Sequence, residues 1–407
     1  MFEALLLVTF IGFVLSNHGR LGTGNPYQIY FFIWLTVYTG YYLTRDLFIR
    51  LDNTFVFVTL VSQYFALFLL IISYLKSAGI TTANRAPDLK TIIINKWFYY
   101  PLFLLVVLGA YPTYLKAIEL ANGQSIFTII GFMTLRNSIT YEGRDFGIFG
   151  YLTPLSMIVA MVSAIGFKNK QVNFLFFLMI LLVSLFYCYM ATGRTYILML
   201  FCFIFMPFFI AKIFSKKSLI ITGLAFVTLF VFIAGMSGKG VSFDNTFSQN
   251  VRSFQENIVG YTTAPFVAMS QLFNNFDEPE YGINSLRFFF AVMQKLGVAE
   301  VTSVDLVKEY VMTPFPTNVY TVYEVYYRDF LYYGYFIPPL FLLFHFALYR
   351  YAVVKGGRWI LFYTASTYPL VMMFFQDQYF SLTSQWIQMI FWLFLLSSRS
   401  RVGRSQM

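Results

Sequence analysis

Charged residues are scarce in this chain. Of its 407 residues only 11% are charged, whereas 58% are hydrophobic, and the mean hydropathy is +0.67. A soluble domain carries about 25% charged residues and cannot bury this much apolar surface in one core. The composition therefore excludes a soluble enzyme and a disordered chain, and it predicts a protein surrounded largely by lipid.

Cysteine and histidine are also scarce, with two residues of each. Cys188 and Cys202 lie within apolar runs, so neither a disulfide framework nor a cysteine-bound metal is expected. The sequence contains no glycine-rich phosphate loop and no Asp/Glu/His cluster with metal-ligand spacing. We therefore expect no metal and no cofactor.

Long apolar runs, by contrast, are abundant. Many have roughly 17–22 residues, the length that a helix needs to cross about 30 Å of hydrocarbon. We predict eleven spans at residues 1–16, 27–44, 54–75, 98–118, 149–166, 172–190, 195–213, 218–235, 330–351, 359–376 and 379–397. The expected fold class is an all-α polytopic integral membrane protein with about 11 transmembrane helices.

The net charge of +10 has a topological explanation. With the basic tail 398–407 in the cytoplasm, the inner loops hold 16 basic residues and one acidic residue. The outer segments hold the other 12 basic and 17 acidic residues. This is a strong positive-inside pattern, so no nucleic-acid partner is needed to explain the basic surplus. His18 then lies in an inner loop and His345 in the inner half of the ninth span, and no histidine faces outwards.

The predicted topology divides the chain into four regions. Residues 1–235 hold the first eight spans, residues 236–329 form a large outer loop, residues 330–397 hold three spans, and residues 398–407 form the cytoplasmic tail. In the large loop, apolar residues at helical spacing predict helices at 247–258 and 285–296 and near 303–305, with Asn284 or Ser285 capping the second. The other long outer segment, 119–148, contains a run at 125–135 that is too short to span and predicts an interfacial or re-entrant helix.

Arginine is the commonest cation on the outer side. The planar guanidinium donates paired hydrogen bonds to phosphate oxygens and keeps its charge, which suits a pyrophosphate or an anionic sugar. The alternative for each arginine is an ion pair with a neighbouring acid or with lipid headgroups. Arg194 stands apart, because its Ala191–Thr195 link is too tight to leave the membrane boundary, where a guanidinium is expensive. The outward arginines are Arg45, Arg50, Arg136, Arg144, Arg194, Arg252, Arg287 and Arg328.

The best acid–base candidates precede the ninth span. Glu324 and Asp329 lie within a tyrosine-rich segment, and tyrosine rings stack on sugars while their hydroxyls reach polar partners. The alternative for Asp329 is a local salt bridge or a helix-end charge. The alternative for the tyrosines is the ordinary aromatic belt of a membrane interface.

This arrangement resembles the bacterial O-antigen, or oligosaccharide repeat-unit, polymerases of the Wzy type. The layout of spans, basic inner side and two large outer loops covers nearly the whole chain. Thr192-Gly193-Arg194-Thr195 is similar to the family's Gly/Ser–Arg turn, and Arg136 with Gly147 fits its R-x10-G spacing. The segment from Asn318-Val319-Tyr320-Thr321 to Asp329-Phe330 is similar to the family's Asn-x-Tyr-Thr…Asp-Phe-Gly pattern, with Leu331 in place of the glycine.

The resemblance implies a metal-independent membrane glycosyltransferase of the GT-C type in the bacterial inner membrane, active on the periplasmic side. Its donor and acceptor would be glycans linked to undecaprenyl pyrophosphate, held within the lipid bilayer. It also implies a chain-length regulator as a partner. Asp329, with Glu324 second, would activate the acceptor. The residues expected to bind substrate are Arg194, Arg136, Arg252, Arg287, Arg328, Asn318, Tyr320 and Tyr327.

Two other functions share this layout. A flippase or other transporter would show inverted repeats and charges deep within the spans, whereas most charges here lie at span ends. An O-antigen ligase uses the same lipid donor, but such ligases place a histidine in the large periplasmic loop. Residues 236–329 contain none. The polymerase is therefore the favoured prediction.

Overall fold

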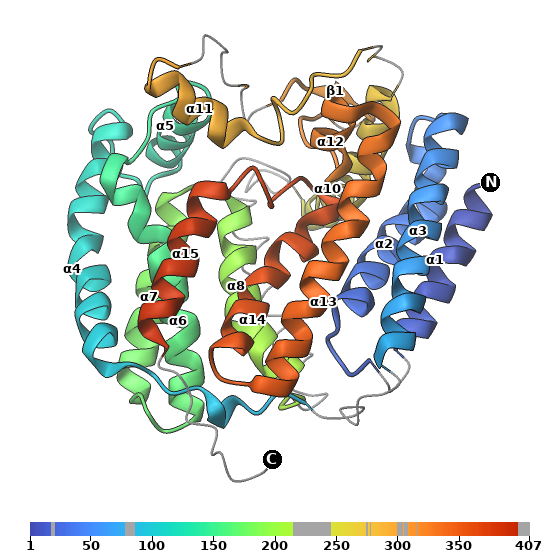
Figure 1. Ribbon diagram of the computed structural model, residues 1–407. Helices are drawn as coiled ribbons and strands as arrows, with labels where there is room; N and C mark the ends of the chain where they lie inside the picture. Colours follow the sequence, from blue (N-terminus) through green and yellow to red (C-terminus); the bar gives the residue numbers. More distant parts are fainter. Residues whose placement is uncertain are drawn as a thin grey trace. The chain divides into compact units, whose positions relative to one another are not determined.

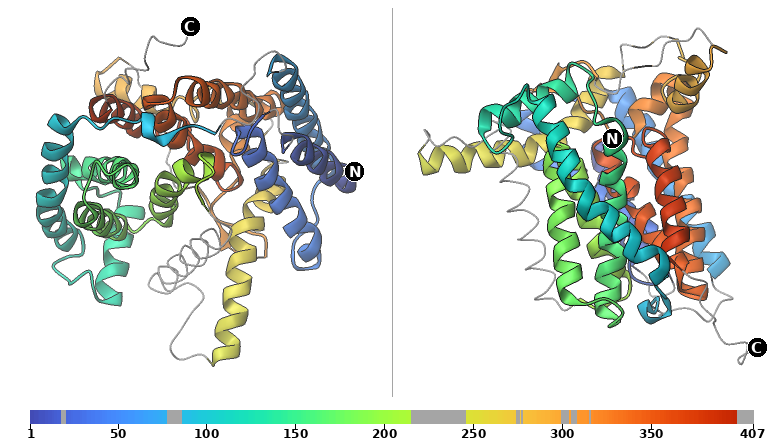
Figure 2. Two further views of the ribbon diagram at one scale, coloured as in Figure 1. Left: turned by 90° about the horizontal axis from the view of Figure 1, so that it is seen from below. Right: turned by 90° about the vertical axis from the view of Figure 1, so that its left-hand side faces the viewer.

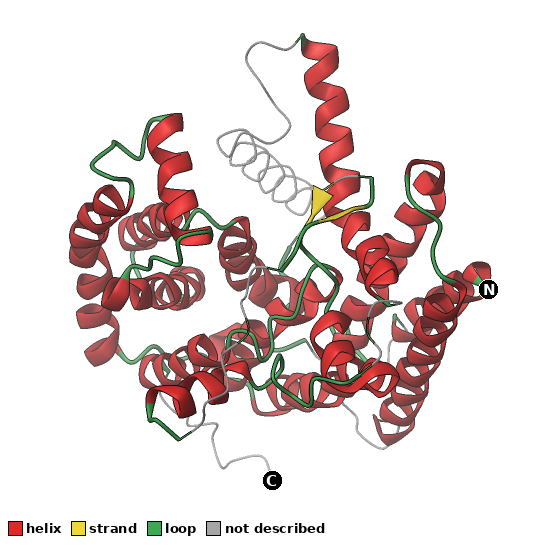
Figure 3. Ribbon diagram, turned by 90° about the horizontal axis from the view of Figure 1, so that it is seen from above, coloured by secondary structure: helices red, strands yellow, loops and turns green. Residues whose placement is uncertain are grey.

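The computed structural model of the protein describes residues 1–17, 21–77, 86–214, 246–273, 276, 278–298, 304, 308–314 and 316–397. Within these ranges the chain is helical almost throughout, as Figure 3 shows. The two described β-strands form one antiparallel pair, in which Val311 faces Thr317 and Met312 faces Pro316. The two strands are β1 (Val311–Met312) and β2 (Pro316–Thr317).

Figure 1 shows the helices in chain order from blue to red. The first half contains α1 (Phe2–Ser16), α2 (Pro26–Thr44), α3 (Asn53–Ser77), α4 (Lys96–Leu120), α5 (Ile129–Thr140), α6 (Leu152–Lys168), α7 (Phe174–Met190) and α8 (Arg194–Ile210). The second half contains α10 (Phe247–Leu272), α11 (Arg287–Lys295), α12 (Tyr323–Phe330), α13 (Ile337–Lys355), α14 (Arg358–Val371) and α15 (Thr383–Leu396). Short 3-10 helices are η1 (Arg45–Leu47), η2 (Leu89–Thr91), η3 (Gly147–Tyr151), η4 (Leu331–Phe336) and η5 (Met372–Phe374).

Local signals in the sequence explain several helix starts. Asn25 accepts a hydrogen bond from the backbone of Gln28, and Pro26 occupies the first turn of α2, where its missing N–H costs nothing. Thr128 caps α5 in the same way, through the backbone of Gly131. A helix is therefore present where one was predicted at 125–135, but it begins after this cap.

The predicted spans coincide with helices wherever the structure describes them. The first seven and the last three each overlap a helix, and the eighth, at 218–235, lies outside the described residues. In the described part of the chain, four helical segments are long and apolar enough to cross a membrane: Asn53–Ser77, Lys96–Leu120, Gly147–Lys168 and Tyr323–Lys355. Shorter apolar helices are Phe2–Ser16, Phe174–Met190, Arg194–Ile210 and Thr383–Leu396. The fold is that of a helical polytopic membrane protein.

The helix of the ninth predicted span is interrupted near its start. The regular helix α13 begins at Ile337 rather than at residue 330. Leu331 has φ 50° and ψ −133°, a conformation that no α-helix contains, so α12 ends there and η4 follows. The hydropathy of the segment continues across this break, and that is why the sequence pattern does not show it.

The described chain forms two compact units, each assembled from separate segments. The first comprises Met1–Ala86, Gln255–Arg350 and Ser366–Ser384. In it, α1 packs against α2 and α3, which lie side by side in Figure 1. Its interior is aromatic: Tyr323 stacks on Tyr335 at 4.5 Å between ring centroids and lies 5.4 Å from Trp34. The hydroxyl of Tyr323 pairs with Ser62 at 2.9 Å, so this buried ring also satisfies its polar atom.

The second unit comprises Pro87–Phe254, Tyr351–Ala365 and Gln385–Met407. Its centre is α6, which contacts α4, α7 and α8 and is buried continuously from Thr153 to Gly166. Figure 2 shows α6 and α7 end-on and side by side. Small residues permit this close packing, as is usual between helices in lipid. A side chain at Gly166 would come within 2.4 Å of Ile94, and one at Gly109 within 2.5 Å of Leu152.

Candidate functional site

Helix α12 carries the predicted acid–base residues and is unusual for a polar helix, because most of it is buried. Tyr323 to Tyr327 and Asp329 are all inaccessible to solvent or nearly so. Its tyrosines fix the helix in the first unit. The Tyr327 hydroxyl donates to the carbonyl of Phe273 at 2.6 Å, and the Tyr326 hydroxyl donates to Oδ1 of Asp377 at 2.9 Å. The charged residues of α12 are thereby held in one orientation.

Glu324 is the centre of a small ionic group. Its Oε1 accepts a hydrogen bond from Nε of Arg328, four residues further along the helix, and lies 3.6 Å from Nζ of Lys308. The Glu324 side chain is 6% exposed, and each cation is 17% exposed. The Arg328 guanidinium also lies over the ring of Phe276, at 4.4 Å from its centroid. Two largely buried cations therefore converge on one carboxylate oxygen.

Asp329 is fully buried and accepts three hydrogen bonds. Oδ1 accepts from the backbone and side-chain amides of Asn284 at 3.0 and 2.9 Å, and Oδ2 accepts from the backbone of Ser285 at 2.7 Å. The side chain of Asn284 also contacts Lys308 at 3.0 Å and Glu280 at 2.5 Å. Asp329 thus joins the turn before α11 to the end of α12.

These residues form one connected group, which we call the acid–base cluster: Glu280, Asn284, Lys308, Glu324, Arg328 and Asp329. An ionised carboxylate offers about four acceptor positions. Three of the four at Asp329 are occupied, and the fourth belongs to Oδ2. The cluster, which also holds the cations Lys308 and Arg328, can therefore orient one carboxylate to accept a proton once a substrate hydroxyl reaches it.

The structure corrects the predicted cap of the second loop helix. Helix α11 begins at Arg287 after Leu286, and neither Asn284 nor Ser285 caps it through a side chain. Their backbone amides point to Asp329 instead, an acceptor 44 or 45 residues further along the chain. The helix predicted at 247–258 is part of α10, and the residues near 303–305 lie largely outside the described part of the chain.

The other residues of the first unit that were predicted to bind substrate lie near the cluster in the sequence. Their contacts are with other residues. Arg287 donates its Nε proton to the carbonyl of Val304. Tyr320 is buried, which raises the pKa of its phenol, and its hydroxyl donates to the carbonyl of Glu309 at 3.2 Å. Asn318 follows β2 and is half-buried. Of the predicted residues here, the structure thus brings together Glu324, Arg328 and Asp329.

The other predicted arginines belong to the second unit. Arg194 is the first residue of α8 and is half-buried. The link before it is as tight as predicted: α7 ends at Met190, and Thr192 takes φ 52° to reverse the chain. Arg136 is half-buried on α5. Arg252 lies on α10, and its side chain is outside the described residues.

A second polar group in the first unit was not expected from the sequence. Nε2 of His345 lies 2.8 Å from the Tyr379 hydroxyl, and Nδ1 lies 3.1 Å from Oγ of Ser366. Tyr379 belongs to the link between η5 and α15, so His345 of α13 contacts that link, and its placement in the inner half of the ninth span stays a prediction. Asp377, in the same link, accepts bonds from Tyr326 and from the backbone of Ser381, at 2.9 Å each.

The Asp377 carboxyl has a raised pKa because it is buried, and the hydrogen bonds from Ser381 and Tyr326 oppose that effect. The sequence feature that could have drawn attention to Asp377 is its position as a single acidic residue between two apolar runs. Lys308 and Asn284 gave no such signal, because their importance depends on contacts made by folding. Among the residues that the structure describes, no group of three His, Cys, Asp or Glu side chains could hold a metal ion.

The helices and the acid–base cluster together define a polytopic membrane protein with ionisable residues buried at the end of an apolar segment. Over most of its length the chain is similar to a curated protein of Escherichia coli (strain K12) with the name "Putative O-antigen polymerase". The two are 22% identical over 382 residues, which cover 90% of this chain and 89% of that protein. The match confirms the resemblance to the O-antigen polymerases at the level of the family. No family model matches the chain, and no solved structure gives a significant match.

Proposed function

We propose that the protein polymerises oligosaccharide repeat units linked to undecaprenyl pyrophosphate, for an O-antigen or a related surface polysaccharide. The observation that carries the proposal is the similarity to the Escherichia coli protein along 90% of the chain. The layout of helices and the buried carboxylates on α12 support it. The reaction takes place on the periplasmic side of the inner membrane, where a chain-length regulator is the expected partner.

The chemistry is a glycosyl transfer between two lipid-linked substrates. A hydroxyl of the new repeat unit attacks the anomeric carbon of the growing glycan, and the bond from that carbon to the pyrophosphate oxygen breaks. The hydroxyl proton passes to a carboxylate, and the undecaprenyl pyrophosphate leaves with the electron pair. Fixed cations can stabilise the charge that develops on such a leaving group without a metal ion.

The acid–base cluster supplies the carboxylate in this proposal. Asp329 is the first choice, because its three hydrogen bonds fix its orientation and leave one acceptor position on Oδ2. Glu324 is the second choice, because Arg328 and Lys308 both contact its Oε1 and so leave less room there for a substrate hydroxyl. Arg194, Arg136 and Arg252 are the proposed pyrophosphate ligands, and Arg287, Arg328, Asn318, Tyr320 and Tyr327 the proposed glycan contacts.

A gene deletion followed by gel analysis of the surface glycan tests this function. Loss of a polymerase leaves the lipid core bearing a single repeat unit, and the wild-type chain restores the ladder of longer polymers. Loss of a ligase gives a different pattern, with unmodified core and accumulation of lipid-linked polymer. Retention of the full ladder in the deletion strain would contradict the proposal.

A further inference from the structure

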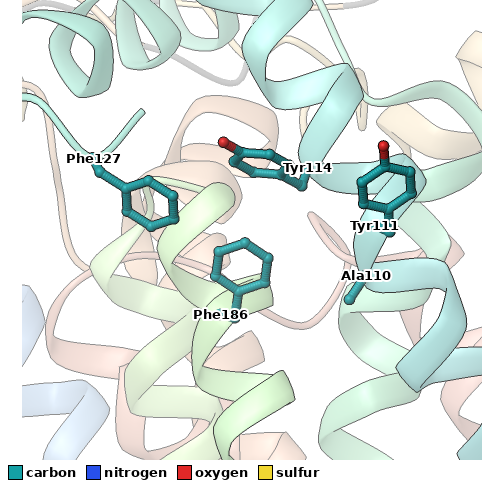
Figure 4. Close-up of a pocket in the computed structure, with 5 residues that line it drawn as sticks. All are labelled: Ala110, Tyr111, Tyr114, Phe127 and Phe186. Atoms are coloured by element: carbon teal, nitrogen blue, oxygen red, sulfur yellow. The ribbon is translucent and has the colours of Figure 1, made fainter. Parts of the chain in front are cut away.

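An aromatic pocket of about 370 Å³ lies in the second unit, separate from the acid–base cluster (Figure 4). Ala110, Tyr111 and Tyr114 come from α4, Phe127 from the link before α5, and Phe186 from α7. The volume is near the lower end of the range of about 300–1,000 Å³ for small-molecule sites. None of the reaction steps above uses this pocket.

Three of the lining residues are rings that contact one another. Tyr114 lies 5.9 Å from Phe127 and 6.1 Å from Phe186, and Phe127 stacks on Phe186 at 6.3 Å between centroids. The link that carries Phe127 is itself fixed, because the Tyr189 hydroxyl donates to the carbonyl of Ile126 at 2.6 Å. Tyr111 and Phe127 remain 68% and 60% exposed, so the pocket is open on that side.

The position of the pocket along its helices places it just beneath one end of them. A helix rises about 1.5 Å per residue, so Ala110 is about 15 Å and Phe186 about 6 Å from the ends of α4 and α7 at Leu120 and Met190. These are the ends that we predict to face the periplasm. An occupant of the pocket would therefore lie in the hydrocarbon region, next to the outer boundary.

A chain of ring contacts leads from the pocket to the helix that carries a cation. Phe127 stacks on Tyr189 at 6.1 Å, and Tyr189 lies 5.0 Å from Phe132 on α5. Arg136 follows Phe132 by one helical turn. In the part of the chain that the structure describes, no hydrogen bond or ion pair engages the Arg136 guanidinium.

Two other cations of this region have acidic partners. Lys116 contacts Glu119 at 2.5 Å, and Arg144 contacts Glu142 at 3.2 Å. Unlike Lys116 and Arg144, Arg136 therefore has its charge to offer to a ligand. An apolar pocket beneath the boundary and a cation beyond it complement an amphiphile with an apolar chain and an anionic head.

We propose that this pocket binds the isoprene units next to the pyrophosphate of the lipid-linked substrate, and that Arg136 contacts the pyrophosphate itself. This assignment rests on the proposed function, which supplies a polyisoprenyl pyrophosphate as the lipid of both substrates. Three rings that contact one another, Tyr114, Phe127 and Phe186, suit a branched, unsaturated chain, whose methyl groups fit between rings. The pocket thereby determines the depth at which the pyrophosphate lies.

Filling the pocket tests the proposal. In Ala110→Trp an indole would occupy the space, whereas Leu108→Trp adds the same ring at an exposed position of α4 that does not line the pocket. The probes are farnesyl pyrophosphate and inorganic pyrophosphate, whose dissociation constants are measured on purified full-length protein in detergent. We expect Ala110→Trp to weaken the binding of farnesyl pyrophosphate at least tenfold and to leave the binding of inorganic pyrophosphate unchanged. Leu108→Trp should change the binding of neither probe.

Two further variants complete the design. Phe127→Ala removes an exposed lining side chain, so the variant should fold normally. It should weaken the binding of farnesyl pyrophosphate several-fold. Arg136→Ala should weaken the binding of both probes by a similar factor. Unchanged farnesyl pyrophosphate binding in Ala110→Trp and Phe127→Ala would overturn the proposal.

A third ligand tests whether the pocket prefers an isoprenoid to an ordinary membrane lipid. If Ala110→Trp weakens the binding of dihexanoyl phosphatidylglycerol as strongly as the binding of farnesyl pyrophosphate, the pocket is a general lipid site and the proposal is wrong. These measurements need no glycan transfer. A polymer ladder that survives gene deletion would therefore refute the polymerase while leaving the binding result intact, and failed binding would leave the polymerase standing.

Discussion

Asp329 is the residue on which the proposed chemistry depends most. Replacement by Asn keeps the shape but removes the proton acceptor, so we expect elongation of lipid-linked repeat units to fall by about 10²–10⁴-fold. Lipid substrate binding should change little. The measurement is the elongation rate of purified protein, together with its thermal unfolding.

The matched control is Asp145→Asn, because Asp145 also accepts a backbone hydrogen bond, from Gly147 at 2.8 Å, but is exposed and outside the acid–base cluster. Its elongation rate should stay near the wild-type value. Normal elongation by stable Asp329→Asn protein would transfer the proposed role to Glu324. A loss of activity that parallels a loss of folded protein would mean that Asp329 only joins the turn to α12.

Leu331 offers a test of the backbone at the residue scale. Its φ of 50° is a conformation that favours glycine, and the resemblance places a glycine at this position. Leu331→Gly should therefore fold as well as the wild type, whereas Leu331→Ile should lose about 1–2 kcal/mol of stability, because a β-branched residue suits positive φ poorly. Thermal unfolding in detergent measures both.

The exposed neighbour Tyr333, 81% accessible, supplies the control. Tyr333→Ile should change stability by less than about 0.5 kcal/mol. Equal effects of isoleucine at the two positions would argue that the backbone at Leu331 carries no strain.

Gly334 determines how the elements α12 and η4 pack against each other. A Cβ at this position would lie 2.1 Å from the carbonyl oxygen of Tyr326, a backbone atom that cannot move aside. Gly334→Ala should therefore displace α12 and with it the acid–base cluster. We expect little folded protein by size-exclusion chromatography. In Gly150→Ala the nearest atom would be Cβ of Phe146 at 3.6 Å, an ordinary contact, so that variant should elute like the wild type.

The sequence predicts the elements better than the contacts between them. Apolar runs located every described span, because hydropathy is a local property. The break at Leu331 and the burial of α12 were not predictable in this way, since both depend on aromatic packing from distant helices. Likewise Glu324 and Asp329 could be selected as charges beside an apolar run. Lys308 and Asn284, which complete the cluster, are brought there only by the fold.

At the scale of the whole molecule, the charge distribution predicts which ends face the cytoplasm. Cysteines introduced at Lys90 and Lys355 should resist an impermeant thiol reagent in intact cells, whereas cysteines at Gln124 and Glu142 should react. All four positions are exposed in the structure, so differences in labelling should report the side of the membrane. The native Cys188 and Cys202 are buried and should contribute little background.

Labelling at Lys90 and Lys355 with protection at Gln124 and Glu142 would reverse the topology. It would also place the acid–base cluster and the aromatic pocket on the cytoplasmic side, where the proposed reaction does not occur. Permeabilised cells provide the control, because all four positions should then react.

The interleaving of the two units has a consequence for biosynthesis. The first unit needs residues from Met1 to Ser384, and the second needs residues beyond Gln385. Helices α1 to α3 therefore leave the ribosome long before α12 and α13 exist to cover them. During that interval their polar and aromatic inner faces must be shielded by the insertion machinery or by lipid. A chain that terminates early within the second half of the message would therefore lack segments of both units, and neither unit could complete its packing.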